Sequence, residues 1–384
     1  MRGVKPICRL PEYESLVVII GLFVAIMFPP LLRAQTSFQL TGHYGFIIPH
    51  REEIQNLIQG HSWGLNADYE LNYKREKFWH RAWSGPRQTW TATYLNTGNP
   101  LQLGSHFSIL HQLFLPLQKL DSQRRIHQTL ALGVGLGYTT KIWNQESNYQ
   151  APALSSHLNT ALALQYGIEF TRNERSRFSA GLRLAHFSNG SLRTPNLGTN
   201  NFSFFVSKRI GALDARKSIK RDSLLTAEIC RYKFTVGYLF GIKEILPPGE
   251  RKYFVSIASL GIDRRMNARY SLCFGLDGMR NSSLPELMKE KLGRSNSVND
   301  LMQLGATFGC SMHFNRFELR FQQGAYIIDG YKQDGLLYQR VGLRFYVSEK
   351  WWLGLMLKTH FAKADYGEYG MGYAISWRKV KFNL

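Results

Sequence analysis

The chain has 384 residues, and its 48 basic and 27 acidic side chains give it a net charge of +21 at pH 7. Aromatic residues make up 13% of it and glycine occurs 34 times, a composition that favours strands over helices. Beyond residue 35 no segment approaches the ~20 consecutive apolar residues that a membrane helix needs. Beyond residue 35, the composition therefore indicates strands rather than membrane-spanning helices.

Residues 1–34 have the layout of a secretory signal peptide. Basic residues precede an apolar stretch from Leu16 to Leu32, and a small residue, Ala34, ends the cleavage pattern. We expect the mature chain to begin at Gln35 with a net charge of +19, since residues 1–34 hold four basic and two acidic side chains. An exported basic chain meets phosphorylated lipids rather than nucleic acid. An uncleaved anchor, and a basic surface that serves solubility alone, are the alternatives.

From Thr36 onward, segments of about ten residues alternate between large apolar side chains on one face and small or polar ones on the other. Residues 130–138 and 158–170 show this most clearly. Shorter polar turns or longer polar loops separate the segments. In chain order, the expected strands lie at about 36–48, 63–74, 88–96, 102–115, 130–138, 158–170, 178–188, 199–210, 230–240, 252–262, 268–276, 302–314, 317–327, 341–346, 351–361 and 367–377.

This pattern predicts an all-β protein: an antiparallel transmembrane β-barrel of about 12–16 strands that occupies residues 35–384 as one domain. Connections on one side of the barrel are short and those on the other are longer. Two connections, 75–87 and 212–226, fall on the side where the other connections are short, but they are long. They do not fit the loop lengths expected of a single barrel. The strands of a soluble β-sandwich also alternate between apolar and polar residues, so a sandwich is the competing architecture. The small residues opposite the apolar ones favour the barrel, because a narrow lumen requires them.

The segment that ends at Ser188 places polar residues on the face that should meet lipid. Its apolar face runs from Phe178 through Leu182 and Leu184, and a period of two continues that face to His186 and Ser188. Polar groups on the lipid-facing surface of a barrel are costly. We therefore interpret this pair as functional.

A serine hydroxyl becomes a nucleophile when a base removes its proton, and His186 is that base for Ser188. Asn200 falls on the outward face of the next strand, where it can accept the second N–H of the imidazole. Asn189 and the backbone around Gly190 can donate hydrogen bonds to a developing oxyanion. The alternative is an inert polar strand end followed by a turn.

The run His186-Phe187-Ser188-Asn189-Gly190, followed by Pro195-Asn196-Leu197-Gly198-Thr199-Asn200, resembles the site of the outer-membrane lipid A 3-O-deacylase family over about residues 178–206. The resemblance implies a barrel enzyme whose serine, histidine and acid cleave an ester-linked acyl chain from lipid A. The family's acid is glutamate, whereas this chain has Asn200. With asparagine there, the spacing also resembles outer-membrane phospholipase A, a calcium-dependent barrel that hydrolyses phospholipids.

The expected function is that of a serine esterase of the bacterial outer membrane, with Ser188, His186 and Asn200 as its catalytic residues. Lipid A or lipopolysaccharide is the preferred substrate, because the Pro-Asn-x-Gly stretch and the positive charge favour it over phospholipid. We expect no metal and no cofactor; the phospholipase interpretation would add calcium, although no acidic residue lies between Asn189 and Asn200. A porin or structural barrel without catalytic activity is a further alternative.

Overall fold

The structure, a computed structural model, describes residues 37–71, 78–118, 125–173, 176–211, 226–249, 251–293, 301–361 and 363–383. The expected signal peptide lies outside these residues. The strands within them are β1 (Ser37–Ile47), β2 (Ser62–Leu71), β3 (Arg87–Asn96), β4 (Ser105–Pro116), β5 (Ile126–Thr139), β6 (Leu158–Asn173), β7 (Ser176–Ser188), β8 (Thr199–Gly211), β9 (Thr226–Glu244), β10 (Lys252–Arg265), β11 (Tyr270–Asn281), β12 (Met302–Phe314), β13 (Phe317–Asp329), β14 (Leu337–Tyr346), β15 (Trp351–His360) and β16 (Lys363–Asn383).

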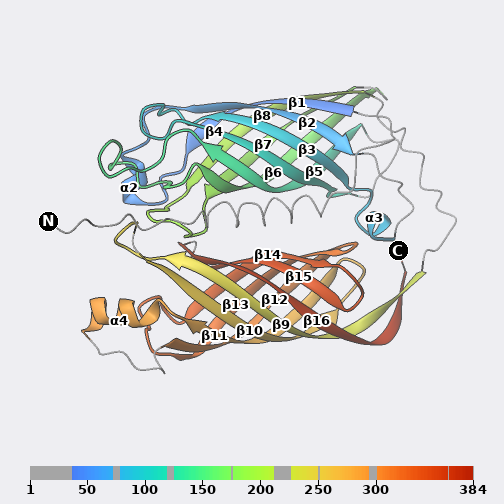
Figure 1. Cartoon of the computed structure of the whole chain (residues 1–384). Helices are drawn as coiled ribbons and strands as arrows, with labels where there is room; N and C mark the ends of the chain where they lie inside the picture. The colour runs from blue at the N-terminus through green and yellow to red at the C-terminus, as the bar shows by residue number, and fades with distance from the viewer. Residues whose placement is uncertain are drawn as a thin grey trace. The chain divides into compact units, whose positions relative to one another are not determined.

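These strands form two closed antiparallel barrels, each of eight strands (Figure 1). In the first, β1 to β8 pair in chain order, and β8 returns to pair with β1 from Ser37↔Gly211 to Ile47↔Asn201. In the second, β9 to β16 pair in the same way, and β16 returns to pair with β9. Every strand therefore has two hydrogen-bonded neighbours, and neither sheet has an open edge.

The predicted all-β class with antiparallel barrel strands is confirmed, and every expected strand has a counterpart close to its predicted position. The prediction that residues 35–384 form a single barrel is wrong, because the first eight strands close on themselves before β9 begins. The long connection at 212–226, which did not fit one barrel, is the stretch that joins the two. Alternation specifies the face of each side chain, but it carries no information on which strand closes the sheet.

Three short helices occur in the described residues: α2 (Glu52–Gln55), α3 (Phe78–Ala82) and α4 (Leu284–Leu292). Each lies in a connection between strands. The helix α3 occupies the second connection that was too long for its side of the predicted barrel. None of the helices in these residues has the length and apolar character required to cross a membrane.

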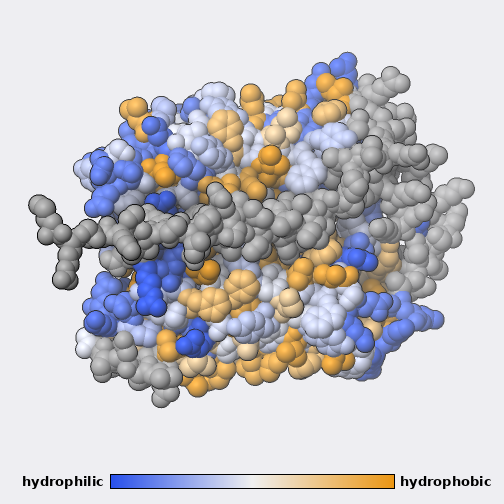
Figure 2. All heavy atoms as spheres, viewed as in Figure 1, coloured by the Kyte–Doolittle hydropathy of each residue, from blue (hydrophilic) through white to orange (hydrophobic). Residues whose placement is uncertain are grey.

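The barrels carry apolar side chains on the outside and polar side chains on the inside. On the first barrel, Leu40 and Val206 are each 66% exposed, while neighbours of opposite parity such as Thr41 and Ser207 are buried. Figure 2 shows hydrophobic residues spread over the walls and hydrophilic ones gathered near the strand ends. A soluble sandwich would place its apolar face in a core, so this arrangement excludes it.

Charged side chains fill the interior of both barrels. They form ion pairs that include Arg209–Glu70 and Arg87–Glu169 in the first barrel, and Arg320–Asp263, Arg320–Glu318, Arg340–Asp277 and Arg340–Glu368 in the second. An eight-stranded barrel is only wide enough for side chains to fill. The packed interiors therefore count against a porin.

Candidate active site

Strands β7 and β8 bring His186 and Asn200 together at one end of the first barrel. The two residues are direct partners in the antiparallel register. Phe187, between His186 and Ser188, is 2% exposed and packs inside the barrel, with its ring 4.6 Å from that of His106. Because successive side chains of a strand alternate, a buried Phe187 places His186 and Ser188 on the outer face.

His186 makes its hydrogen bond through Nδ1, which lies 2.6 Å from Oδ1 of Asn200. An amide oxygen only accepts hydrogen bonds, so this contact requires the proton on Nδ1. In the neutral imidazole, Nε2 is then unprotonated and basic. Asn200 thus orients the ring and selects its tautomer, although it brings no negative charge.

The hydroxyl of Ser188 lies between two N–H donors. Asn196 Nδ2 donates to Ser188 Oγ at 2.8 Å, and the backbone N–H of Gly190 donates to it at 3.2 Å. No hydrogen bond joins His186 to Ser188 in the described part of the chain. Both side chains lie on one face of β7, as the period-two pattern predicted, and Ser188 Oγ is hydrogen-bonded to residues of the segment that follows.

The side chain of Asn189 is turned away from Ser188 and is 6% exposed. Its Nδ2 lies 3.0 Å from Ser156 Oγ, 3.3 Å from Ser155 Oγ and 3.0 Å from the carbonyl of Arg193. These contacts anchor the segment to the connection between β5 and β6. The amide group beside Ser188 Oγ belongs to Asn196, a residue that the sequence singled out only as part of the Pro195-Asn196-Leu197-Gly198 stretch.

Residues 189–199, here called the catalytic segment, are held close to His186. Gly198 has φ +76°, and its N–H donates to the carbonyl of Ala153 at 2.8 Å. A Cβ atom at Gly198 would lie 2.9 Å from Cε1 of His186, so only glycine fits against the ring. The preceding carbonyl, of Leu197, accepts a hydrogen bond from His50 Nε2 at 2.9 Å.

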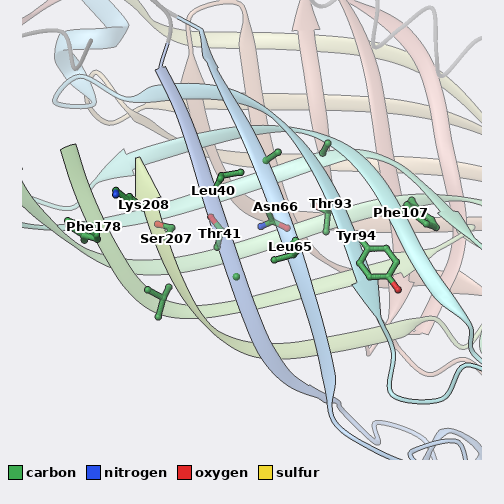
Figure 3. A pocket seen from close by; sticks show the side chains of 14 residues that line it. Leu40, Thr41, Leu65, Asn66, Thr93, Tyr94, Phe107, Phe178, Ser207 and Lys208 are labelled. Carbon is green, nitrogen blue, oxygen red and sulfur yellow. The ribbon is translucent and has the colours of Figure 1, made fainter. Parts of the chain in front are cut away.

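Within the described ranges, no group of three or more His, Cys, Asp or Glu side chains is placed to hold a metal ion. A hollow of about 670 Å³ lies on the outer wall of the first barrel (Figure 3). Small residues, Gly42, Ala67 and Ala92, line it together with larger apolar side chains such as Leu40 and Val206. Val206 lies six residues along β8 from Asn200, about 20 Å away in an extended strand. The hollow is therefore separate from His186, Ser188 and Asn200.

The fold and the outward polar residues define a class: the protein is an outer-membrane protein built of two β-barrels. The first barrel matches the family model described as "Lipid A 3-O-deacylase (PagL)" over residues 63–209. The second barrel matches the model described as "Acyloxyacyl hydrolase, C-terminal domain" over residues 230–377. The two matches cover residues 63–209 and 230–377, so each barrel is similar to one of these two family models.

Solved structures similar to this chain include one titled "Crystal structure of the outer membrane enzyme PagL". It is 16% identical, with a TM-score of 0.33, and the match covers 44% of this chain and 97% of the other. A porin of Rhodopseudomonas blastica, a triple mutant, is 8% identical with a TM-score of 0.17, and the match covers 89% of this chain and 99% of the porin. No curated protein matches the sequence.

Proposed function

We propose that this protein removes an ester-linked acyl chain from lipid A, with Ser188 as nucleophile, His186 as general base and acid, and Asn200 as the residue that orients the imidazole. The observation that supports this most directly is the outward imidazole of His186, bonded through Nδ1 to Asn200 on the same face as Ser188. A chain that starts on the periplasmic side and crosses with each strand would end β7 on the outer side. The site would then lie at the outer leaflet, where lipid A resides.

In the first half of the reaction, His186 Nε2 takes the proton of Ser188 Oγ while Oγ attacks the acyl carbonyl carbon. The bond between the carbonyl carbon and the sugar oxygen then breaks, and the imidazolium gives its proton to the leaving alkoxide. In the second half, water attacks the acyl-serine with His186 again as base. The fatty acid leaves, and the hydroxyl of Ser188 is restored.

The two N–H groups at Ser188 are suited to stabilise the tetrahedral intermediate. The oxyanion is the former carbonyl oxygen, bonded to the carbon that Oγ attacks, and it lies within reach of the donors that now bond to Oγ, Asn196 Nδ2 and the N–H of Gly190. Donors already oriented toward developing charge are among the largest contributions to such catalysis. We assign the oxyanion role to Asn196 and Gly190, and to Asn189 the anchoring of the segment that carries them.

The neutral Asn200 sets this site apart from a triad with a carboxylate. It supports the correct tautomer of His186, but it stabilises the imidazolium less than a charged acid would. The same asparagine is what favours the second candidate, a calcium-dependent phospholipase. The family match of the first barrel favours lipid A.

The test is an assay of fatty-acid release by the purified full chain in detergent, with lipid A and with phospholipid as separate substrates. Ser188→Ala is the control, and a calcium chelator is added in a parallel series. We expect release from lipid A that persists in chelator and disappears in Ser188→Ala. If the wild type and Ser188→Ala release equally little fatty acid from both substrates, the proposal that the protein is an enzyme fails. If the wild type releases fatty acid from phospholipid and the chelator stops this release, the calcium-dependent phospholipase is the better proposal.

A further inference from the structure

The catalytic segment of the first barrel is hydrogen-bonded to residues of the second. The carbonyl of Ser191 accepts from the backbone N–H of Glu244, the last residue of β9, at 3.0 Å. The hydroxyl of Ser191 donates to the carbonyl of Ala364 in β16 at 2.9 Å. Ser191 has φ +65°, a left-handed conformation that is unfavourable for a residue with a side chain. These contacts hold that conformation in place.

The carboxylate of Glu244 binds a second point of the same segment. Its Oε1 accepts from Thr194 Oγ1 at 3.0 Å and from the backbone N–H of Thr194 at 3.3 Å. The N–H of Gly249 adds a third donor at 2.8 Å. Glu244 is 5% exposed, so these donors satisfy a charge that is largely removed from water. Hydrogen bonds to an ionised acceptor are stronger than those between neutral groups.

The two points that Glu244 binds, Ser191 and Thr194, lie in the chain between the two donors to Ser188 Oγ. Ser191 directly follows Gly190, whose N–H bonds to Ser188 Oγ, and Thr194 lies two residues before Asn196, whose amide does the same. We propose that Glu244 is a positioning residue that holds these two donors on Ser188, so that the second barrel completes the active site of the first. This inference rests on the proposed function. It assigns a role in the reaction to a barrel that has no nucleophile of its own at the site.

The kinetic test compares Glu244→Ala with Glu244→Gln in the full chain. Alanine removes the acceptor, whereas glutamine keeps an oxygen at the position of Oε1. We expect Glu244→Ala to lower kcat for fatty-acid release by about 10–100-fold with little change in KM, because displacements of about 1 Å in a catalytic group can cost this much. Glu244→Gln should restore most of the rate. Thr194→Val removes the hydroxyl that donates to Glu244 Oε1 but keeps the backbone N–H donor, so it should lower kcat less than Glu244→Ala.

A second readout does not depend on activity. Arg193 is exposed within the catalytic segment, so trypsin cleavage after Arg193 reports how firmly the segment is held. Glu244→Ala should be cleaved there faster than the wild type, with Glu244→Gln close to the wild type. Cleavage after Lys141, exposed in the connection between β5 and β6, is the internal control and should not change. It also shows whether the first barrel stays folded.

The outcomes separate the two proposals. A Glu244→Ala protein with wild-type kcat and wild-type cleavage at Arg193 would overturn the positioning role and leave the deacylase intact. Equal losses in Glu244→Ala and Glu244→Gln, together with faster cleavage at Lys141, would also overturn it, since the defect would then be in folding. If the wild type releases no more fatty acid than Ser188→Ala, the proposed function fails, and the role of Glu244 in catalysis fails with it.

Discussion

The two barrels share a design but differ at the end of their seventh strand. In the first barrel, β7 ends with His186 and Ser188 on the outer face. In the second, the corresponding strand β15 has Leu355 and Leu357 on that face, and its histidine, His360, bonds to the hydroxyl of Tyr326 at 3.0 Å. The two barrels thus share the eight-stranded wall but not this pair of outward polar residues. The polar pair must have the outward parity, and an adjacent segment must supply donors.

The barrels also differ in what surrounds the strand end. The connection between β7 and β8 has ten residues, 189–198, which fold back over Ser188 and His186, whereas β15 is followed almost directly by β16. A short turn leaves no chain to carry groups equivalent to Asn196 and Gly198. The contribution of the second barrel is instead the anchor at Glu244. The experiments below test this division between a catalytic and a supporting barrel, from the largest expected effect to the smallest.

Replacing Ser188 with alanine should abolish fatty-acid release, a loss of about 10⁴-fold or more, because no other hydroxyl of β7 can take its place. The matched change in the second barrel, Thr359→Ala near the end of β15, should leave the rate unchanged. Both are measured as initial rates of release from lipid A. Activity that survives in Ser188→Ala but falls in Thr359→Ala would reverse the assignment of the two barrels.

Asn196→Ala should lower kcat by about 10²–10³-fold, the usual loss when one oxyanion donor is removed. Asn189→Ala should act differently: it removes buried hydrogen bonds to Ser155 and Ser156, so trypsin should cleave the segment faster at Arg193. Steady-state kinetics and proteolysis of both variants separate the two roles. If Asn189→Ala loses more kcat than Asn196→Ala and trypsin cleavage at Arg193 is unchanged, Asn189 is the oxyanion donor, as the sequence predicted.

Gly198→Ala should lower kcat by about tenfold or more, because the added methyl group meets the ring of His186. The matched control is Gly335→Ala in the second barrel. Both glycines have positive φ, +76° and +85°, but a Cβ at Gly335 meets no atom within 4 Å. Both changes carry a similar backbone penalty of about 1 kcal/mol. Equal kinetic effects would show that backbone strain, and not contact with His186, is responsible.

Asn200→Glu should shift the pH profile without abolishing the reaction. A carboxylate beside His186 stabilises the imidazolium, the protonated form of the base, through its negative charge. The general base must be neutral, so activity that is lost as the pH falls should be lost at a higher pH in the variant. The measurement is kcat/KM for lipid A from about pH 4 to pH 9. An unchanged acidic limb would indicate that residue 200 does not contact the base.

The sequence supports much of the fold and part of the site. Period-two alternation located the strands and the outward parity of His186 and Ser188, because side-chain direction in a strand follows directly from residue order. The same parity placed Asn200 beside His186. The identity of the oxyanion donor was not accessible in this way. Residues 189–199 have no regular period, so nothing local indicates that the Asn189 side chain turns toward Ser155 and Ser156 and that of Asn196 toward Ser188.

The order of apolar and polar residues thus determined a membrane-facing wall, a polar interior and an imidazole directed outward, since each depends only on neighbours along one strand. The number of barrels was decided by pairing between strands far apart in the chain, such as β1 with β8 and β9 with β16. The contact between Thr194 and Glu244 likewise joins residues fifty positions apart. Such contacts depend on how the closed barrels place their connecting segments, and only the tertiary structure specifies that.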